Sequence, residues 1–304
     1  MLPSLAHQPR LSNHDRTLAA RLVQRVCVRP PYLALNDVLV EGTRMRAEAR
    51  AESPAFGEIG PMPAAEIGRH AAIAGLLHAA ARQRDDDRRY YLAREASCTY
   101  VANDAPYGTP VAFESEVVEL SKRGCRAHVV VTAGGHPLAR VELAYAILTE
   151  ATFGRLFRTR AKPTPPAPNP YGALLATHFE SGTDWAEQVV PALPVASCVG
   201  HFDGHPALPV AQLMGQLSYL AGRLVGGGAR PYRVVRGEIE ADDLAWAGER
   251  ATFRVRRVEA ASDANAAPDA GADHCFDCVA LADEREVGRM RLWIASVGEA
   301  ARRV

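Results

Sequence analysis

The chain has 304 residues, of which 48% are hydrophobic and 23% charged, a composition typical of a folded protein with a substantial core. Its 35 basic residues balance its 35 acidic residues, so net charge favours neither nucleic acid nor a membrane as a partner. No apolar run reaches the roughly 18 residues of a membrane span, and six cysteines are spread thinly along the chain. We therefore expect a protein of the reducing cytoplasm.

The first half of the chain has one predicted helix followed by strands. Residues 1–25 are expected to form an N-terminal arm, and residues 31–40 and 43–50 are predicted strands. Residues 63–83 form a predicted helix, because Pro63 suits a first turn and small apolar residues recur at helical spacing. Further strands are predicted over residues 89–101, 110–120, 127–132 and 137–148. This is an α+β order, not the alternating order of a parallel sheet.

The same order returns after a proline-rich segment. Residues 161–170 contain five prolines and are predicted to be a stiff linker. A second helix is predicted over residues 209–224, with strands over residues 232–240, 249–259, 274–282 and 286–297 and a loop over residues 260–273. The repeated order predicts two tandem domains, residues 26–160 and 171–304, with little identity between them.

A motif lies directly before the second helix. Residues 201–209 read His-Phe-Asp-Gly-His-Pro-Ala-Leu-Pro, which resembles the His-Phe-x-Gly-x-Pro-x-x-Pro signature of hotdog-fold 3-hydroxyacyl-carrier-protein dehydratases. Residues 31–39 resemble the opening strand of the same family. The resemblance implies two tandem hotdog folds, each a long central helix wrapped by an antiparallel sheet. It also implies that His201 points into an acyl tunnel and that Pro209 opens the central helix.

Dehydration needs a base for the proton next to the thioester carbonyl and an acid for the departing hydroxyl. His201 is the expected base, because the unperturbed pKa of histidine lies near neutrality. In the family, the acid belongs to an Asp/Glu-x-x-x-Gln/His pattern on the central helix of the opposite half. The second helix has Gly215 at the expected position, fourteen residues after His201. Taken alone, the second half therefore lacks its acid.

The first helix carries a Glu-x-x-x-His pattern at Glu66 and His70. A spacing of four residues places both side chains on one helix face. We therefore predict a composite catalytic site of His201, Glu66 and His70, although Glu66 comes about three residues before the family position. The resemblance also implies that a helix N-terminus supplies donors for the thioester oxygen. The residues expected to contact substrate are Phe202, Gly204, Pro209, Val210, Gln216 and Arg69; for Arg69, a solvated side chain is the interpretation that the sequence favours over a substrate anchor.

The primary expectation is a dehydratase, or reverse hydratase, acting on a 3-hydroxyacyl thioester in fatty-acid or polyketide-type biosynthesis. The first alternative is a hotdog thioesterase or acyltransferase in which Glu66, with His70, activates water. The second alternative is a non-catalytic acyl-binding module. The substrate would be carried by acyl carrier protein or coenzyme A, with no other cofactor and no metal ion. Exposed sheet edges would allow a homodimer.

Overall fold

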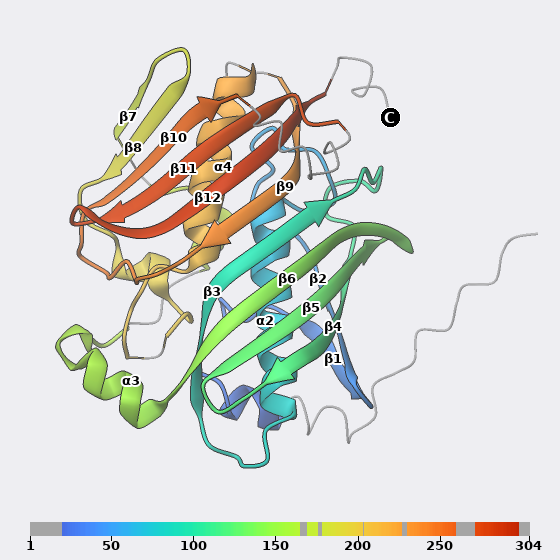
Figure 1. Ribbon diagram of the computed structural model, residues 1–304, viewed down its shortest axis with the longest axis vertical. Coiled ribbons are helices and arrows are strands. Elements are labelled where there is room, and N and C mark those ends of the chain that lie inside the picture. The colour runs from blue at the N-terminus through green and yellow to red at the C-terminus, as the bar shows by residue number, and fades with distance from the viewer. Residues whose placement is uncertain are drawn as a thin grey trace, which may run out of the picture.

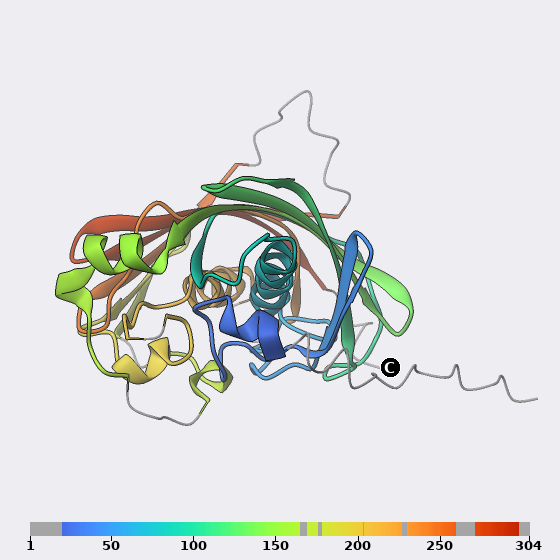
Figure 2. The same ribbon diagram turned by 90° about the horizontal axis from the view of Figure 1, so that it is seen from below.

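The computed structural model describes residues 20–164, 169–175, 178–202, 204–226, 230–259 and 271–297. Its strands form one twelve-stranded antiparallel sheet in the order β1-β2-β4-β5-β6-β3-β9-β12-β11-β10-β8-β7 (Figure 1). The sheet curves around two long helices, α2 and α4, which lie on its concave side (Figure 2). The architecture is therefore α+β, as the order of elements predicts.

The described part of the first half holds six strands, the helices α2 and α3, and a helical turn at residues 20–24. Their bounds are β1 Asn36–Glu41, β2 Arg44–Ala49, α2 Ala64–Ala81, β3 Arg89–Tyr100, β4 Val111–Leu120, β5 Gly124–Ala133, β6 His136–Thr149 and α3 Glu150–Leu156. The second half holds β7 His178–Ser181, β8 Trp185–Val190, α4 Val210–Gly226, β9 Tyr232–Glu240, β10 Ala251–Val258, β11 His274–Ala282 and β12 Arg285–Ser296. Three short 3₁₀ helices, η1 Arg158–Arg160, η2 Pro170–Gly172 and η3 Val195–Cys198, lie between α3 and α4.

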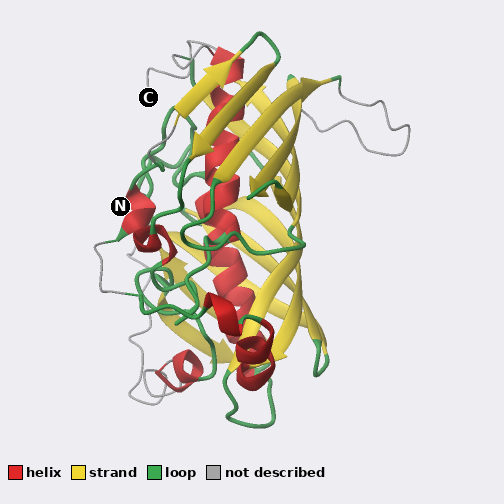
Figure 3. Ribbon diagram, turned by 90° about the vertical axis from the view of Figure 1, so that its left-hand side faces the viewer, coloured by secondary structure: helices red, strands yellow, loops and turns green. Residues whose placement is uncertain are grey.

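The two halves repeat one strand order. Read outward from the centre of the sheet, each half runs from its third strand to its sixth, fifth, fourth, second and first. The halves meet where β3 pairs with β9, the corresponding strand of the other half. Both helices lie along one side of the sheet, with loops covering their other side (Figure 3). This arrangement brings the middle of each helix close to the loops of the opposite half.

Helix α2 is buried on nearly all faces because its residues are small. Its buried set includes four alanines from 64 to 74, and a Cβ added at Gly75 would lie 2.5 Å from the Tyr145 hydroxyl. That hydroxyl donates to the Ala72 carbonyl at 2.9 Å. A larger residue at position 75 would therefore push the sheet away from the helix. No helix in the described part of the chain is long and apolar enough to cross a membrane.

Some elements differ from the prediction. The strand predicted from residue 31 begins only at Asn36, because the carbonyls of Pro31 and Tyr32 accept hydrogen bonds from the Arg69 side chain. Helix α3 and strands β7 and β8 were not predicted. Most of the N-terminal arm, part of the proline-rich linker and most of the 260–273 loop lie outside the described residues.

Candidate functional site

A sharp turn at Gly200 places His201 near the N-terminal end of α4. Gly200 has a φ of +80°, and a Cβ there would lie 2.3 Å from the Arg29 carbonyl oxygen. The Gly200 carbonyl in turn accepts from the Arg29 amide at 2.7 Å. The backbone conformation and the close approach of a second chain segment both require glycine. The turn therefore joins the His201 loop to the N-terminal segment of the first half.

The His201 ring is held in one tautomer. Its Nδ1 lies 2.9 Å from the carbonyl oxygen of Ala207; a carbonyl only accepts, so Nδ1 carries the proton and Nε2 keeps its lone pair. The ring stacks on Phe202 at 4.0 Å between centroids and meets the Tyr32 ring edge at 5.0 Å. Burial lowers the pKa of His201 to about 4. His201 is therefore neutral near pH 7 and can accept a proton at Nε2.

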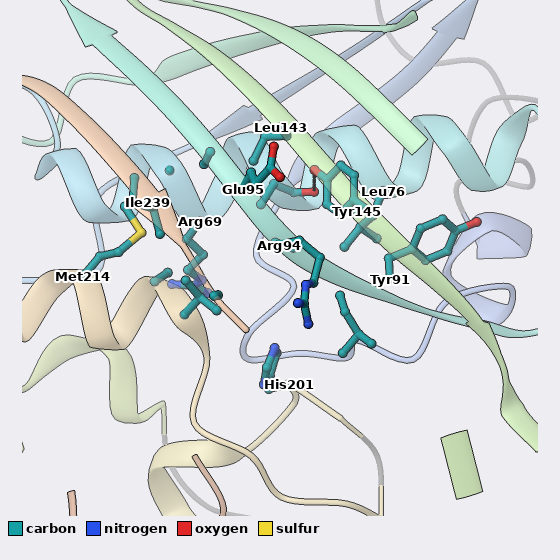
Figure 4. A pocket seen from close by; sticks show the side chains of 18 of the residues that line it. Arg69, Leu76, Tyr91, Arg94, Glu95, Leu143, Tyr145, His201, Met214 and Ile239 are labelled. Carbon is teal, nitrogen blue, oxygen red and sulfur yellow. Dashed lines mark hydrogen bonds between the residues drawn. The ribbon is translucent and has the colours of Figure 1, made fainter. Parts of the chain in front are cut away.

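His201 lines an apolar cavity between the two halves, into which Arg69 and Arg94 also project (Figure 4). The cavity measures about 1040 Å³ when its open mouth is included. Most of its wall is apolar and comes from α2, β3, β6 and the first turn of α4; the wall includes Leu76, Tyr91, Leu143, Tyr145, Val210, Ala211 and Met214. The apolar lining of this cavity suits an acyl chain.

Charged residues border the cavity where β3 approaches the end of β9. Arg94 lies at an irregularity of the β3–β6 pairing between Ala93 and Glu95, and a bulge of this kind re-aims a side chain. Its guanidinium binds the Asp242 carboxylate at 2.6 Å. The three carboxyl groups that line the cavity are all partly exposed, and each pairs with an arginine: Glu95 with Arg126, Asp242 with Arg94, and Asp243 with Arg285.

Arg69 is buried, so the interpretation as a solvated side chain is wrong. Its side chain is 2% exposed and binds the Glu52 carboxylate at 2.7 Å. The guanidinium also donates to the carbonyls of Pro31 and Tyr32 at 2.7 and 2.6 Å, and it lies 4.3 Å from the centroid of the Tyr171 ring. Arg69 therefore fixes the segment that carries Tyr32 against His201.

Glu66 and His201 line different cavities. The Glu66 carboxylate accepts from the amides of Glu52 and Ser53 at 2.7 and 3.1 Å, and it faces a second cavity together with Gln216. His70 lies 3.6 Å from Glu66, and neither of its ring nitrogens has a hydrogen-bond partner among the described residues. Burial lowers the pKa of His70. The structure thus joins Glu66 to His70 but not to His201.

A register between the halves explains this separation. Residues 55–63 align without gaps with residues 201–209, which pairs Phe56 with Phe202 and Pro63 with Pro209. Counting fourteen residues from Ala55, the equivalent of His201, reaches Arg69 rather than Glu66. The residue that faces the His201 cavity from the family's acid position is therefore a buried arginine. This ungapped register was the sequence signal that could have identified it.

Of the other expected substrate contacts, Phe202 and Val210 line the His201 cavity, whereas Gly204, Pro209 and Gln216 do not. The Gly204 carbonyl accepts from the Lys162 amide at 3.0 Å. Pro209 precedes the first residue of α4, and its carbonyl accepts from the amides of Gln212 and Leu213 at 2.9 and 3.2 Å. Gly204 and Pro209 thus shape the loop and the helix start, while Val210 and Ala211 of the first turn of α4 line the cavity.

Glu52, Glu66 and His70 form a cluster with the donor types of a metal site. Their potential ligand atoms lie within 4.8 Å of one another. However, Glu52 already binds the Arg69 guanidinium, and Glu66 is occupied by two amides. A second cation beside a buried guanidinium would be repelled. We therefore interpret the cluster as an ion-pair network around Arg69.

No protein-family model matches the sequence, and no curated protein matches it. Solved structures are nevertheless similar to it over most of its length. The TesB protein of Mycobacterium avium subs. paratuberculosis has a TM-score of 0.54 at 12% identity, covering 93% of this chain and 100% of that chain. The 12:0-ACP thioesterase from Umbellularia californica has a TM-score of 0.51 at 12% identity, covering 85% and 96%.

A protein with a hot dog fold from Alicyclobacillus acidocaldarius has a TM-score of 0.50 at 12% identity, covering 89% of this chain and 99% of that chain. Identities this low establish the fold alone. The chain therefore has a hotdog fold similar to that of the thioesterases, which confirms the hotdog fold that the motif at residues 201–209 implies.

Proposed function

We propose that the protein hydrolyses an acyl thioester, with the acyl chain in the His201 cavity. The observation that carries this proposal is the neutral His201 ring, whose Nδ1–H is fixed on Ala207 and whose Nε2 is left to activate water. We also propose that residues 26–160 and 171–304 are tandem hotdog folds, a proposal supported by their repeated strand order.

Hydrolysis suits this site better than dehydration because of the leaving group. A thiol with an ordinary pKa near ~8.5 departs as a thiolate without a strong acid. Dehydration expels hydroxide, whose conjugate acid is water with a pKa of about 15.7, so it requires a protonated acid. The described carboxyl groups around the cavity are exposed and paired with arginines, and they offer no such acid.

The chain's own groups provide the steps of hydrolysis. His201 Nε2 takes a proton from water while the water oxygen attacks the thioester carbonyl carbon. The amides of Val210 and Ala211, in the first turn of α4, donate to the resulting oxyanion. When the carbon–sulfur bond breaks, the thiolate takes the proton from His201, which leaves a carboxylic acid and a thiol. Both carrier forms, coenzyme A and acyl carrier protein, present this thioester on a pantetheine arm.

The proposal is tested by following thiol release from acyl-CoA and acyl-pantetheine substrates with a thiol-reactive dye. We expect His201→Gln to lower the rate by about 10²–10⁴-fold, the usual contribution of a general base. Glu66→Gln is the matched control, because Glu66 lies outside the cavity, and it should lower the rate much less. Loss of thiol release in Glu66→Gln, with normal release in His201→Gln, would show that Glu66 and not His201 activates the water.

Dehydration is the second candidate function, favoured by the motif at residues 201–209. Incubation with a 2-enoyl thioester and mass spectrometry of the intact thioester separates the two reactions, because hydration adds one water without releasing thiol. Addition of water that depends on His201 would establish that the protein is a dehydratase. Tight binding with neither reaction would establish the acyl-binding alternative.

A further inference from the structure

A second cavity lies at the place in the first half that corresponds to the His201 cavity. It is an open cavity that encloses about 590 Å³ with its mouth included. It is built from the loop before α2, the start of α2 and the middle of α4, and its lining includes Phe56, Glu58, Glu66, Gly215, Gln216 and Tyr219. The two cavities share Arg69 and Ala211 as walls.

This second cavity lacks the base of the first. In the ungapped register of residues 55–63 on 201–209, Ala55 takes the place of His201. On the facing helix, Gly215 takes the place of Arg69. The second cavity therefore lacks the imidazole of the first, and no second arginine stands at position 215, although Arg69 lines both cavities.

The Gln216 amide is the unusual group in this cavity. The side chain is 1% exposed, and neither its oxygen nor its nitrogen has a hydrogen-bond partner among the described residues. A buried amide without partners costs free energy. It offers one acceptor and two donors from a single planar group, which matches the donor and acceptor of another amide.

The charges around the cavity disfavour an anion. Glu58 and Glu66 line it directly, and Glu52 lies behind them in the pair with Arg69. Glu52 and Glu66 thus face a single guanidinium, which is already bound to Glu52. Burial raises the pKa of Glu58 to about 7, so Glu58 adds part of a negative charge at pH 7, and its carboxyl accepts a hydrogen bond from the Ala64 amide at 2.7 Å. An uncharged ligand avoids the repulsion that a carboxylate or phosphate would meet here.

We propose that the Gln216 cavity is a second, non-catalytic binding site for an uncharged amide-bearing group, the chemistry of a pantetheine arm. The Gln216 side chain would donate one hydrogen bond to the ligand amide and accept another from it. Phe56 and Tyr219 would pack against the methylene groups of the ligand. The site goes beyond the proposed hydrolysis, because binding here requires neither His201 nor bond cleavage.

The test is isothermal titration calorimetry of the full chain with pantetheine, an uncharged diamide, at pH 7. Pantothenate, which keeps one amide but ends in a carboxylate, is the matched anionic probe and should bind at least tenfold more weakly. We expect Gln216→Leu to lose one pantetheine site or weaken it at least tenfold. His201→Ala should retain that site.

Thermal unfolding checks that Gln216→Leu remains folded; its midpoint should equal or exceed that of the unsubstituted protein, since an unpaired amide has been replaced by an apolar group of similar size. Gly215→Val is a second variant that fills the cavity while leaving the amide in place, and it should also lose the site. Unchanged pantetheine stoichiometry and affinity in both variants would overturn the proposal. Loss of the site in His201→Ala would also overturn it, while hydrolysis is tested separately by thiol release.

Discussion

The Nδ1–H of His201 donates to the carbonyl of Ala207, six residues later in the same loop, at 2.9 Å. The loop therefore selects the tautomer of its own base before any substrate is present. Phe202 and Tyr32 pack on the ring, so solvent reaches little of it. The same contacts that orient the imidazole also disfavour its charged form, so activity should fall at a lower pH than it would with an ordinary histidine.

The rate of thioester hydrolysis should fall only at low pH. Because burial lowers the pKa of His201 to about 4, Nε2 is unprotonated throughout the neutral range. We expect kcat/KM to stay nearly constant from about pH 8 down to about pH 5.5 and to fall as one proton binds near pH 4. A profile whose acid limb lies near ~6.5, the ordinary histidine value, would mean that His201 is solvated or is not the base.

Protonation of His201 also opposes folding, so the acid limb needs a control. The folded-state pKa lies below the unfolded value, and stability from this group is present above about pH 6.5 and lost as pH falls toward 4. The buried His70 has a lowered pKa and acts in the same direction. Circular dichroism recorded at pH 4 would separate the two: native signal with lost activity indicates titration of His201 in the folded protein, whereas loss of the signal indicates unfolding.

Gly200→Ala should be far more damaging than Gly204→Ala. Both glycines have positive φ, +80° and +73°, so both substitutions carry a similar backbone cost of about 1–2 kcal/mol. A Cβ at position 200 would also lie 2.3 Å from the Arg29 carbonyl, whereas nothing lies within 4 Å of a Cβ at position 204. Chemical denaturation should therefore show a clearly larger loss of unfolding free energy for Gly200→Ala. Equal losses would contradict the close approach at Arg29.

Arg69→Met should destabilise the protein by about 3 kcal/mol or more, the usual cost of removing one partner of a buried ion pair. The substitution leaves the carbonyls of Pro31 and Tyr32 without their donor and Glu52 without its guanidinium. Arg69→Lys keeps the charge but not the planar fork, and it should recover only part of the loss. Urea denaturation measures both; full recovery by lysine would show that charge alone matters.

Much of the fold could be predicted because its signals are local. The small residues of α2 and the alternating strands such as β5 and β9 have periodicities that fix their type and nearly their bounds. Strands β7 and β8 were missed because they are only four and six residues long, and β7 is the edge strand of the sheet. Helix α3 is one short segment whose start depends on a cap, the Thr149 side chain accepting from the Thr152 amide.

The candidate site was predicted only in part, because the residues that face His201 from α2 depend on how the two long helices are turned relative to each other. His201 was identified from its own motif, and it does line the acyl-sized cavity. Which residue of α2 faces that cavity depends on the rotation and axial position of α2 against α4, and three positions along a helix shift a side chain by about 4.5 Å along the axis and about 60° around it. Arg69 therefore faces the cavity where Glu66 was expected.

Glu58→Gln should stabilise the protein at alkaline pH and change little at acid pH. Burial raises the pKa of Glu58 to about 7, so the folded state holds its proton more tightly than the unfolded chain. The contribution of Glu58 to stability is fully present below about pH 4.5 and is lost as pH rises through 7. Glutamine keeps an oxygen for the Ala64 amide but never ionises.

We expect thermal or urea unfolding to show Glu58→Gln more stable than the unsubstituted protein by about 1–2 kcal/mol at pH 8 and nearly equal to it at pH 4.5. Glu119→Gln is the matched control, because that carboxyl is 69% exposed and its removal should show no such dependence on pH. A stability difference for Glu58→Gln that stays constant from pH 4.5 to pH 8 would mean that Glu58 is ionised in the folded protein at both values. The wall of the second cavity would then carry a full negative charge at neutral pH, which would strengthen its discrimination against anions.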